Sequence, residues 1–290
     1  MAAKRAAGAE ISLRKACALL NVNRSTVYRQ RHPSHRTVSD REIISRIRAV
    51  QEKKKYTYGI DRMTAELRSG GIVINHKRVA RLMRENGLNA VIRKKRNYFC
   101  GVAPSEHGQL PGNLLNREFN AEKPGDKFAS DVTYIPLKDG GWCYASLVKD
   151  LATSEIIACA TSRFQNLALG QETLDQLDGK GVQGGMFHTD QGFLYTHPIF
   201  RERLESMGLV QSLSRKGNCL DNAVIESFNG TMKCEWFYPR FGKGRWNLTF
   251  EQAAKMVKEY VRYYNEERIQ KKLGYLTPVQ YREKIALLLE

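Results

Sequence analysis

Hydrophobic residues recur at helical spacing near the start of the chain. Within residues 11–31, Ala16, Leu19 and Leu20 predict the inner face of one short helix, and Val27 predicts that of a second. Three residues between them break the pattern, as expected for a helix-turn-helix. The polar positions expected to point outward from the second helix are Arg24, Thr26 and Tyr28.

A second helical group follows. Asp40 is a suitable N-cap for a helix that buries Ile43 and Ile47, and a shorter helix over 61–68 leads to a Gly-Gly turn. A third helix is expected to start after Asn75 and to end at a glycine, with apolar residues on one face and basic residues on the other. This arrangement predicts a second helix-turn-helix. Its outward basic positions are Lys77, Arg78 and Arg81.

Beyond residue 120 the pattern changes from helical to strand-like. The order strand, strand, strand, helix, strand, helix, strand, helix predicts a mixed five-stranded sheet flanked by helices, an α/β fold. The expected strands cover 128–137, 141–149, 155–161, 183–188 and 210–214. The expected helices cover 167–177, 199–207, 222–237 and 250–264, followed by a reversal of the chain around 275–281.

These changes of pattern predict five segments. They are a helix-turn-helix over 1–38, a second helical DNA-binding domain over 39–92, a basic linker over 93–120, an α/β core over 121–245 and a helical extension over 246–290. The linker has no periodicity, and its cluster of cations is suited to tracking a phosphate backbone. That cluster consists of Arg93, Lys94, Lys95 and Arg96.

The distribution of charge indicates a polyanionic partner. The chain has 290 residues, with 47 Lys and Arg against 30 Asp and Glu, a net charge of +17. Residues 1–120 hold 25 of the cations and 9 of the acids, so they carry +16 of that charge. A basic surface that serves only solubility needs no such segregation, so nucleic acid is the favoured partner. The mean hydropathy of −0.49 and the unpaired spacing of the six cysteines predict a protein of the reducing cytoplasm without a membrane span.

Three carboxylates stand where an α/β fold places its chemistry. Asp131 lies within the first strand, Asp190 follows the fourth strand, and Glu226 lies in the helix over 222–237. Asn229 and Lys233 share the helix face of Glu226, whereas Glu235 points the opposite way. Carboxylates without His or Cys suit Mg²⁺ or Mn²⁺, and two such ions are expected. The alternative is that these acids merely pair with surface cations.

The surroundings of these carboxylates resemble a known family. Asp131 and Asp190 enclose 58 residues, and Asp190 and Glu226 enclose 35. With the stretches SDVTYI, HTDQGFLY, LSRKGNCLDNAVIESFNGTMKCE and YNEERIQKKLGYLTPVQY, the chain resembles the DDE core of retroviral integrases and insertion-sequence transposases, in particular the OrfB protein of the IS3 family. The resemblance implies an RNase H-like core, a metal-binding triad of Asp131, Asp190 and Glu226, and a DNA contact at Lys233.

The resemblance also implies an activity and partners. A DDE transposase is a polynucleotidyl transferase that hydrolyses DNA at the ends of an element and joins the freed 3′-OH to another phosphodiester. The expected partners are the terminal inverted repeats and target DNA, in at least a dimer of the chain, in the bacterial cytoplasm at the nucleoid. End recognition falls either to an upstream-frame OrfA partner or to the helix-turn-helix over 1–38. The other hypotheses are a catalytically silent DNA-binding regulator and a nuclease for RNA–DNA hybrids.

Overall fold

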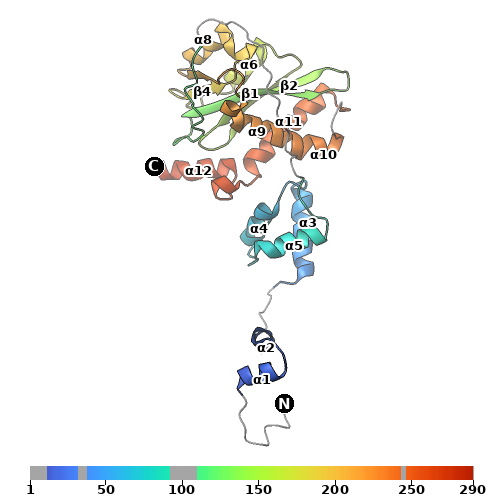
Figure 1. Ribbon diagram of the computed structural model, residues 1–290. Helices are drawn as coiled ribbons and strands as arrows, with labels where there is room; N and C mark the ends of the chain where they lie inside the picture. Colours follow the sequence, from blue (N-terminus) through green and yellow to red (C-terminus); the bar gives the residue numbers. More distant parts are fainter. Residues whose placement is uncertain (1–11, 32–37, 92–109, 243–245, 290) are drawn as a thin grey trace, which may run out of the picture. The chain divides into compact units, whose positions relative to one another are not determined.

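The computed structural model describes residues 12–31, 38–91, 110–242 and 246–289 (Figure 1). The chain divides into two compact units, residues 1–46 and residues 47–290. Each unit is described by itself. The expected cluster of cations at 93–96 lies outside the described residues.

The first unit holds the expected pair of short helices. They are α1 (Leu13–Leu19), capped by the Ser12 side chain, and α2 (Arg24–Arg31). The expected inner face was wrong in part, because Leu19 is 74% exposed and Cys17 is buried instead. Leu19 lies two residues beyond Cys17 and so on the opposite side of the helix. Leu20 is also exposed, because it is the C-cap and the chain turns away at Asn21, whose φ is 49°.

Three helices follow in the segment before residue 92. They are α3 (Asp40–Lys53), which crosses the boundary between the units, α4 (Ile60–Ser69) and α5 (His76–Glu85). The Asn75 side chain accepts a hydrogen bond from the amide of Lys77, the predicted N-cap. At the other end Gly87 has a φ of 66°, and the amide of Leu88 bonds back to Met83, a reversal that favours glycine.

The α/β core is built on one five-stranded sheet. Its strands are β1 (Lys127–Pro136), β2 (Trp142–Asp150), β3 (Ile156–Ser162), β4 (Met186–Thr189) and β5 (Val210–Leu213). They lie in the order β3-β2-β1-β4-β5. β1 is antiparallel to β2 and parallel to β4, so it is the central strand of a mixed sheet. The predicted fold class is confirmed.

Helices cover both faces of this sheet, with α6 and α8 on one side and α9 and α11 on the other (Figure 1). Phe128 and Phe187 pack beneath the first pair, whereas Ala129 and Leu147 pack beneath the second. The alternation along β1 thus divides the core into two layers. The helices are α6 (Leu167–Asp175), α7 (Phe193–Thr196), α8 (Pro198–Ser206), α9 (Ala223–Met232), α10 (Tyr238–Phe241), α11 (Phe250–Glu266) and α12 (Pro278–Leu289).

Two expectations about the C-terminal helices need correction. The helix expected over 222–237 is not continuous: a 3₁₀ turn, η2 (Cys219–Asn222), precedes α9, and a π-helical segment, η3 (Lys233–Phe237), follows it. The predicted reversal near 275 is present as a bridge between Gln270 and Leu276, after the short 3₁₀ turn η4 (Lys271–Leu273). Helix α12 then begins at Pro278 and was not predicted, although Thr277 and Gln280 form a reciprocal cap there.

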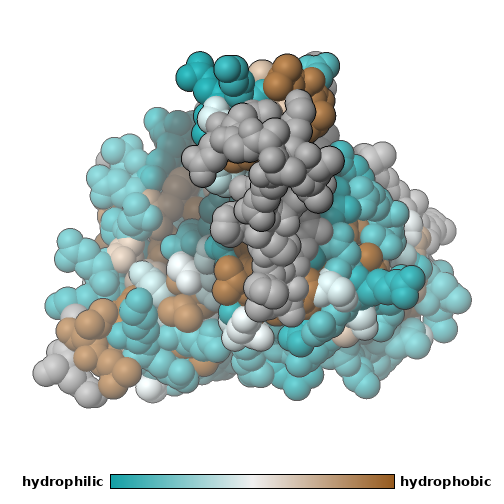
Figure 2. All heavy atoms as spheres, turned by 90° about the horizontal axis from the view of Figure 1, so that it is seen from below, coloured by the Kyte–Doolittle hydropathy of each residue, from teal (hydrophilic) through white to brown (hydrophobic). Residues whose placement is uncertain are grey.

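Hydrophilic side chains cover most of the coloured surface in Figure 2, and the hydrophobic residues form small separate patches. In the parts of the chain that the structure describes, no helix is both long enough and apolar enough to cross a membrane.

Candidate active site

Strand pairing brings Asp131 and Asp190 together. β1 and β4 run parallel, with Ala129 opposite His188. Two residues further along this register, Asp131 in β1 lies beside Asp190, which follows the last residue of β4. Side chains two apart point to the same face of a sheet, so both carboxylates lie on the side covered by α9.

Asp190 is held against the backbone of its own loop. Its Oδ1 accepts a hydrogen bond of 2.9 Å from the amide of Gly192. A Cβ atom at position 192 would lie 2.9 Å from the same oxygen. The φ of Gly192 is −63°, which any residue adopts, so a larger residue here would disturb the Asp190 carboxylate rather than the backbone.

Helix α9 is anchored to β1 by two asparagines. Asn229 Nδ2 donates to Asp131 Oδ2 over 2.8 Å, and Asn222 Nδ2 donates to the carbonyl of Ser130 over 3.2 Å. Glu226 lies between them, one helical turn from each, so it shares their face. The adjoining face is the predicted core stripe, because Ile225 and Phe228 are buried.

The other two carboxylates influence the pKa of Asp131. Burial, and then the negative charges of Asp190 and Glu226, raise the pKa of Asp131 to about 7, although the hydrogen bond from Asn229 opposes the rise. Burial also raises the pKa of Asp190, against the effect of the Gly192 amide. Like charges that share a desolvated site destabilise one another, so this arrangement favours a cation.

The donor chemistry fits a hard divalent cation. The carboxylates offer only oxygen, and the side-chain oxygens of Asn222 and Asn229 are buried without a hydrogen-bond partner. Within the described ranges, however, no three His, Cys, Asp or Glu side chains are arranged closely enough to hold an ion.

The later residues of this helical stretch have separate contacts. Lys233 is the first residue of η3, directly after α9. Its Nζ lies 4.8 Å from the centre of the Tyr134 ring. Glu235 accepts two hydrogen bonds of 2.8 and 2.7 Å from the Arg268 guanidinium and one from the Tyr260 hydroxyl. Glu235 is thus a buried structural acid, as its orientation predicts.

Asp221 is a buried carboxylate that sequence reasoning missed. It receives two 2.8 Å hydrogen bonds from the Arg215 guanidinium, one of 2.8 Å from Arg117 Nε and one from Asn113. The Arg215 guanidinium is the main cause that holds the pKa of Asp221 well below its usual range. This cluster fixes the turn that leads into α9. Its partners Asn113 and Arg117 are more than 100 positions away in the sequence, so no local pattern predicts these contacts.

The predicted DNA-contacting side chains differ in exposure. Arg24, Thr26 and Tyr28 of α2 are exposed. In α5, Lys77 is exposed, whereas Arg78 and Arg81 are half-buried. Arg81 also forms an ion pair of 2.8 Å with Glu85, one turn further along the helix.

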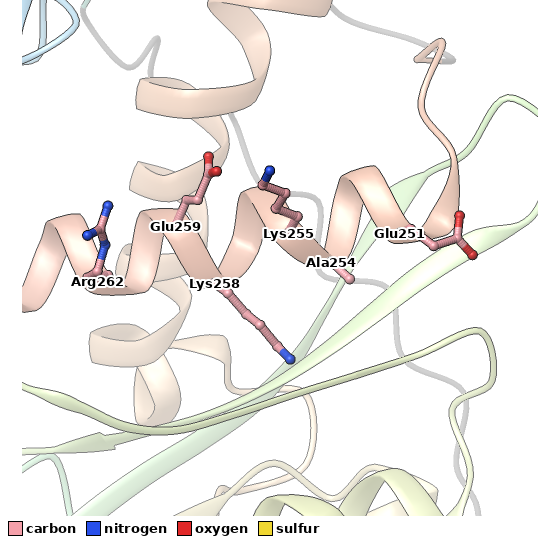
Figure 3. Close-up of a pocket in the computed structure, with 6 residues that line it drawn as sticks. All are labelled: Glu251, Ala254, Lys255, Lys258, Glu259 and Arg262. Atoms are coloured by element: carbon pink, nitrogen blue, oxygen red, sulfur yellow. The ribbon is translucent and has the colours of Figure 1, made fainter.

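A shallow pocket of about 470 Å³ lies along α11, and none of the three carboxylates lines it. Figure 3 shows Lys255 and Glu259 pointing to the same side of the helix, while Lys258 extends toward the strands. The pocket contains three cations and two carboxylates, so its charges largely offset one another. It is lined by Glu251, Ala254, Lys255, Lys258, Glu259 and Arg262.

The family models that the chain matches agree with this architecture. Residues 39–96 match an HTH-like domain, and residues 121–219 and 207–278 match two models of an integrase core domain. A chain of the intasome of simian T-cell lymphotropic virus, solved in complex with PP2A regulatory subunit B56 gamma, aligns with 81% of this chain and 73% of its own, at 13% identity and a TM-score of 0.49.

Curated relatives match over nearly the whole chain. The InsK protein of insertion sequence element IS150 from Escherichia coli (strain K12) is 36% identical over 267 residues, 91% of this chain and 90% of its own length. The transposase InsF for insertion sequence IS3A, from the same strain, is 32% identical over 284 residues, 95% of this chain and 96% of its own. The chain therefore belongs to the insertion-sequence transposases of the IS3 OrfB type, with an HTH-like domain followed by an integrase core.

Proposed function

We propose that this transposase cleaves DNA at the ends of its element and joins the freed 3′-OH to another phosphodiester, with Asp131, Asp190 and Glu226 as the catalytic carboxylates. The observation that carries the proposal is the parallel register of β1 and β4. This register supports adjacent positions for Asp131 and Asp190, which are distant in sequence. The hydrogen bond from Asn229 to Asp131 holds the helix of Glu226 against the same strand.

The three carboxylates are the residues that would hold divalent ions, Mg²⁺ or Mn²⁺. A bound pair of such ions supplies activation of the attacking oxygen and stabilisation of the leaving oxygen. The chain's own residues orient the carboxylates: Asn229 holds Asp131, and the Gly192 amide holds Asp190. The unpartnered oxygens of Asn222 and Asn229 are acceptors suited to bound water.

The DNA contacts fall into three groups. The first helix-turn-helix offers Arg24, Thr26 and Tyr28 for the terminal inverted repeats. The HTH-like domain offers Lys77, Arg78 and Arg81, together with the cations at 93–96, for repeat or target DNA. Lys233 lies beyond the Glu226 helix and contacts a phosphate beside the scissile bond. An upstream-frame OrfA partner remains an alternative source of end recognition.

Joining two ends requires two ends in one assembly, so the active complex has at least two subunits. A single triad accommodates one scissile phosphate at a time. Mass measurement of the complex with element-end DNA is expected to show two or more chains, and a monomeric complex that joins two ends would contradict this expectation.

The test of the triad is a cleavage assay on labelled element ends with Mg²⁺. Asp190→Asn is expected to abolish cleavage and joining but to leave DNA affinity nearly unchanged, because the basic first part of the chain supplies most of that affinity. Asp178→Asn is the matched control, because this exposed acid is paired with Arg203 at 2.8 Å. Substantial cleavage by Asp190→Asn would disprove the assignment, and wild-type protein that binds ends without cutting them would favour a silent regulator.

A further inference from the structure

A groove of about 580 Å³ lies between the start of α4 and the segment that follows α11, within residues 47–290. The second side of the groove belongs to the stretch YNEERIQKKLGYLTPVQY, which the catalytic triad does not use. The groove is lined by Gly59, Ile60, Asp61 and Arg62 on the first side and by Arg268, Gln270, Lys271 and Lys272 on the second.

Positive charge exceeds negative charge along this groove. Four of the lining side chains are cationic and one, Asp61, is a carboxylate. Asp61 is paired with Lys271 Nζ at 2.8 Å. Arg62 and Arg268 share one carboxylate outside the groove, Glu235, at 3.7 and 2.7 Å.

Lys272 adds a cation whose charge is only weakly compensated. The Lys272 side chain reaches the surface, but the protein atoms packed around it, and then the positive charge of Lys149, lower its pKa to about 8. Lys149 is itself buried behind this segment, where its Nζ donates to the Tyr264 hydroxyl over 3.2 Å. An anion in the groove would relieve this repulsion.

Hydrogen-bond donors also line the groove. Gln270 is 7% exposed, and its Nε2 makes no hydrogen bond of good geometry, although the side chain interacts with the Tyr264 hydroxyl, whose pKa is raised mainly by burial. Helix α4 begins beside it with Gly59 as N-cap, and no side chain caps its first amides. A Cβ on Gly59 would meet no atom within 4 Å, so the N-cap itself is not covered by other side chains.

We propose that this groove binds a phosphate group of the DNA backbone, at a position separate from the catalytic carboxylates. A phosphodiester offers the charge and the acceptor oxygens that the cations, the Gln270 amide and the α4 amides lack. The inference rests on the proposed DNA-binding role of the chain. DNA is favoured over a free anion because one side of the groove belongs to the HTH-like domain and the other to the C-terminal segment. A DNA strand bound by the HTH-like domain is long enough to place a phosphate between the two.

The first test measures the salt dependence of binding to a random-sequence DNA duplex. Lys272→Ala is expected to reduce the slope of log affinity against log salt by about 0.9, which is the loss of one phosphate contact. Between about 50 and 200 mM salt, wild-type affinity then falls about threefold more than variant affinity. The control is Lys284→Ala, an exposed lysine of α12 outside the groove, which is expected to leave the slope unchanged. Equal slopes for Lys272→Ala and wild type, or equal losses in both variants, would overturn the proposal.

The second test changes the charge in the opposite direction. Asp61→Asn removes the carboxylate that competes for Lys271, so it is expected to tighten DNA binding severalfold. Glu283→Gln, on the exposed face of α12, removes the same charge outside the groove and is expected to change affinity much less. An equal gain in both variants would show general electrostatics rather than a site. Neither test requires cleavage, so an inactive triad and an unused groove give different results.

Discussion

The side-chain amide of Asn229 in α9 donates a 2.8 Å hydrogen bond to Asp131 Oδ2 in β1. The two residues are separated by 98 positions in the chain. Because Glu226 lies one turn before Asn229, this bond fixes the helix that carries one carboxylate against the strand that carries another. Asn229 is thus a positioning residue for the proposed triad.

Replacing Asn229 tests that role. Asn229→Ala is expected to lower cleavage and joining roughly 10- to 100-fold and to raise the Mg²⁺ concentration needed for half-maximal rate, because groups that orient metal ligands affect metal affinity by such factors. A magnesium titration of the cleavage rate measures both effects. Thr231→Ala on the same helix, which loses only a bond to the Ser227 carbonyl, is the control. An unchanged magnesium requirement would contradict the positioning role.

Gly192 provides a second test of carboxylate position. The methyl group of Gly192→Ala would lie 2.9 Å from Asp190 Oδ1. The carboxylate must therefore move, and its hydrogen bond with the amide of residue 192 is weakened. Cleavage is expected to fall at least tenfold while thermal stability changes little, since the φ of −63° suits alanine. Gly112→Ala, where a Cβ meets no atom within 4 Å, is the steric control. Wild-type cleavage by Gly192→Ala would show that this contact is not needed.

Lys233 is expected to engage DNA rather than metal. Lys233→Ala is predicted to weaken binding to element ends and to slow joining while the magnesium requirement stays unchanged, because an ammonium group contacts phosphate as a point charge. Lys233→Arg retains the charge and is expected to restore most of the binding. Tyr134→Phe keeps the ring that lies 4.8 Å from Lys233 Nζ and serves as the control. Full activity of Lys233→Ala would remove this role.

The buried Lys149 makes the free energy of unfolding change with pH in the alkaline range. Burial, and then the charge of Arg268, lower its pKa in the folded protein to about 8 from an ordinary value of 10.5. Below pH 8 the lysine is protonated in both the folded and the unfolded protein. Burial of the charged ammonium therefore destabilises the folded state by about 3 kcal/mol at neutral pH. Between pH 8 and 10.5 the folded state releases its proton first, and the destabilisation disappears as pH rises.

The variant Lys149→Met isolates this contribution. It is expected to unfold at a higher denaturant concentration than wild type at pH 7, and the difference should shrink toward pH 10. Lys284→Met on the exposed face of α12 is expected to show no such convergence. Denaturant unfolding at several pH values makes the measurement, and a difference that grows with pH would have the wrong sign.

Removal of the first helix-turn-helix tests end recognition. Deleting residues 1–38 is expected to reduce discrimination between element-end and random DNA more than it reduces binding to random DNA. Base contacts contribute about 1–3 kcal/mol each to discrimination, whereas phosphate contacts act on all sequences. Competition binding with the two duplexes measures the ratio. An equal loss on both would make this segment a general electrostatic anchor.

Local spacing along the sequence determined most of the elements. The β-branched and aromatic run over 128–137 predicts the strand β1, and the Asn75 cap with a glycine after residue 86 predicts α5. These signals are local because backbone geometry repeats every two or 3.6 residues. The five-stranded sheet follows from the order of such segments, and the resemblance to the OrfB proteins adds the expected triad.

The tertiary structure decided which acids share an environment. Asp221 and Glu226 are five positions apart and equally acidic, yet Asp221 is neutralised by Arg215 and Arg117, while Glu226 raises the pKa of Asp131. The π-helical turn at Lys233 and the basic groove at Lys272 were likewise decided by packing. The reason is physical: such contacts join segments up to about two hundred positions apart, and their energy depends on chain closure and desolvation, which no local pattern encodes.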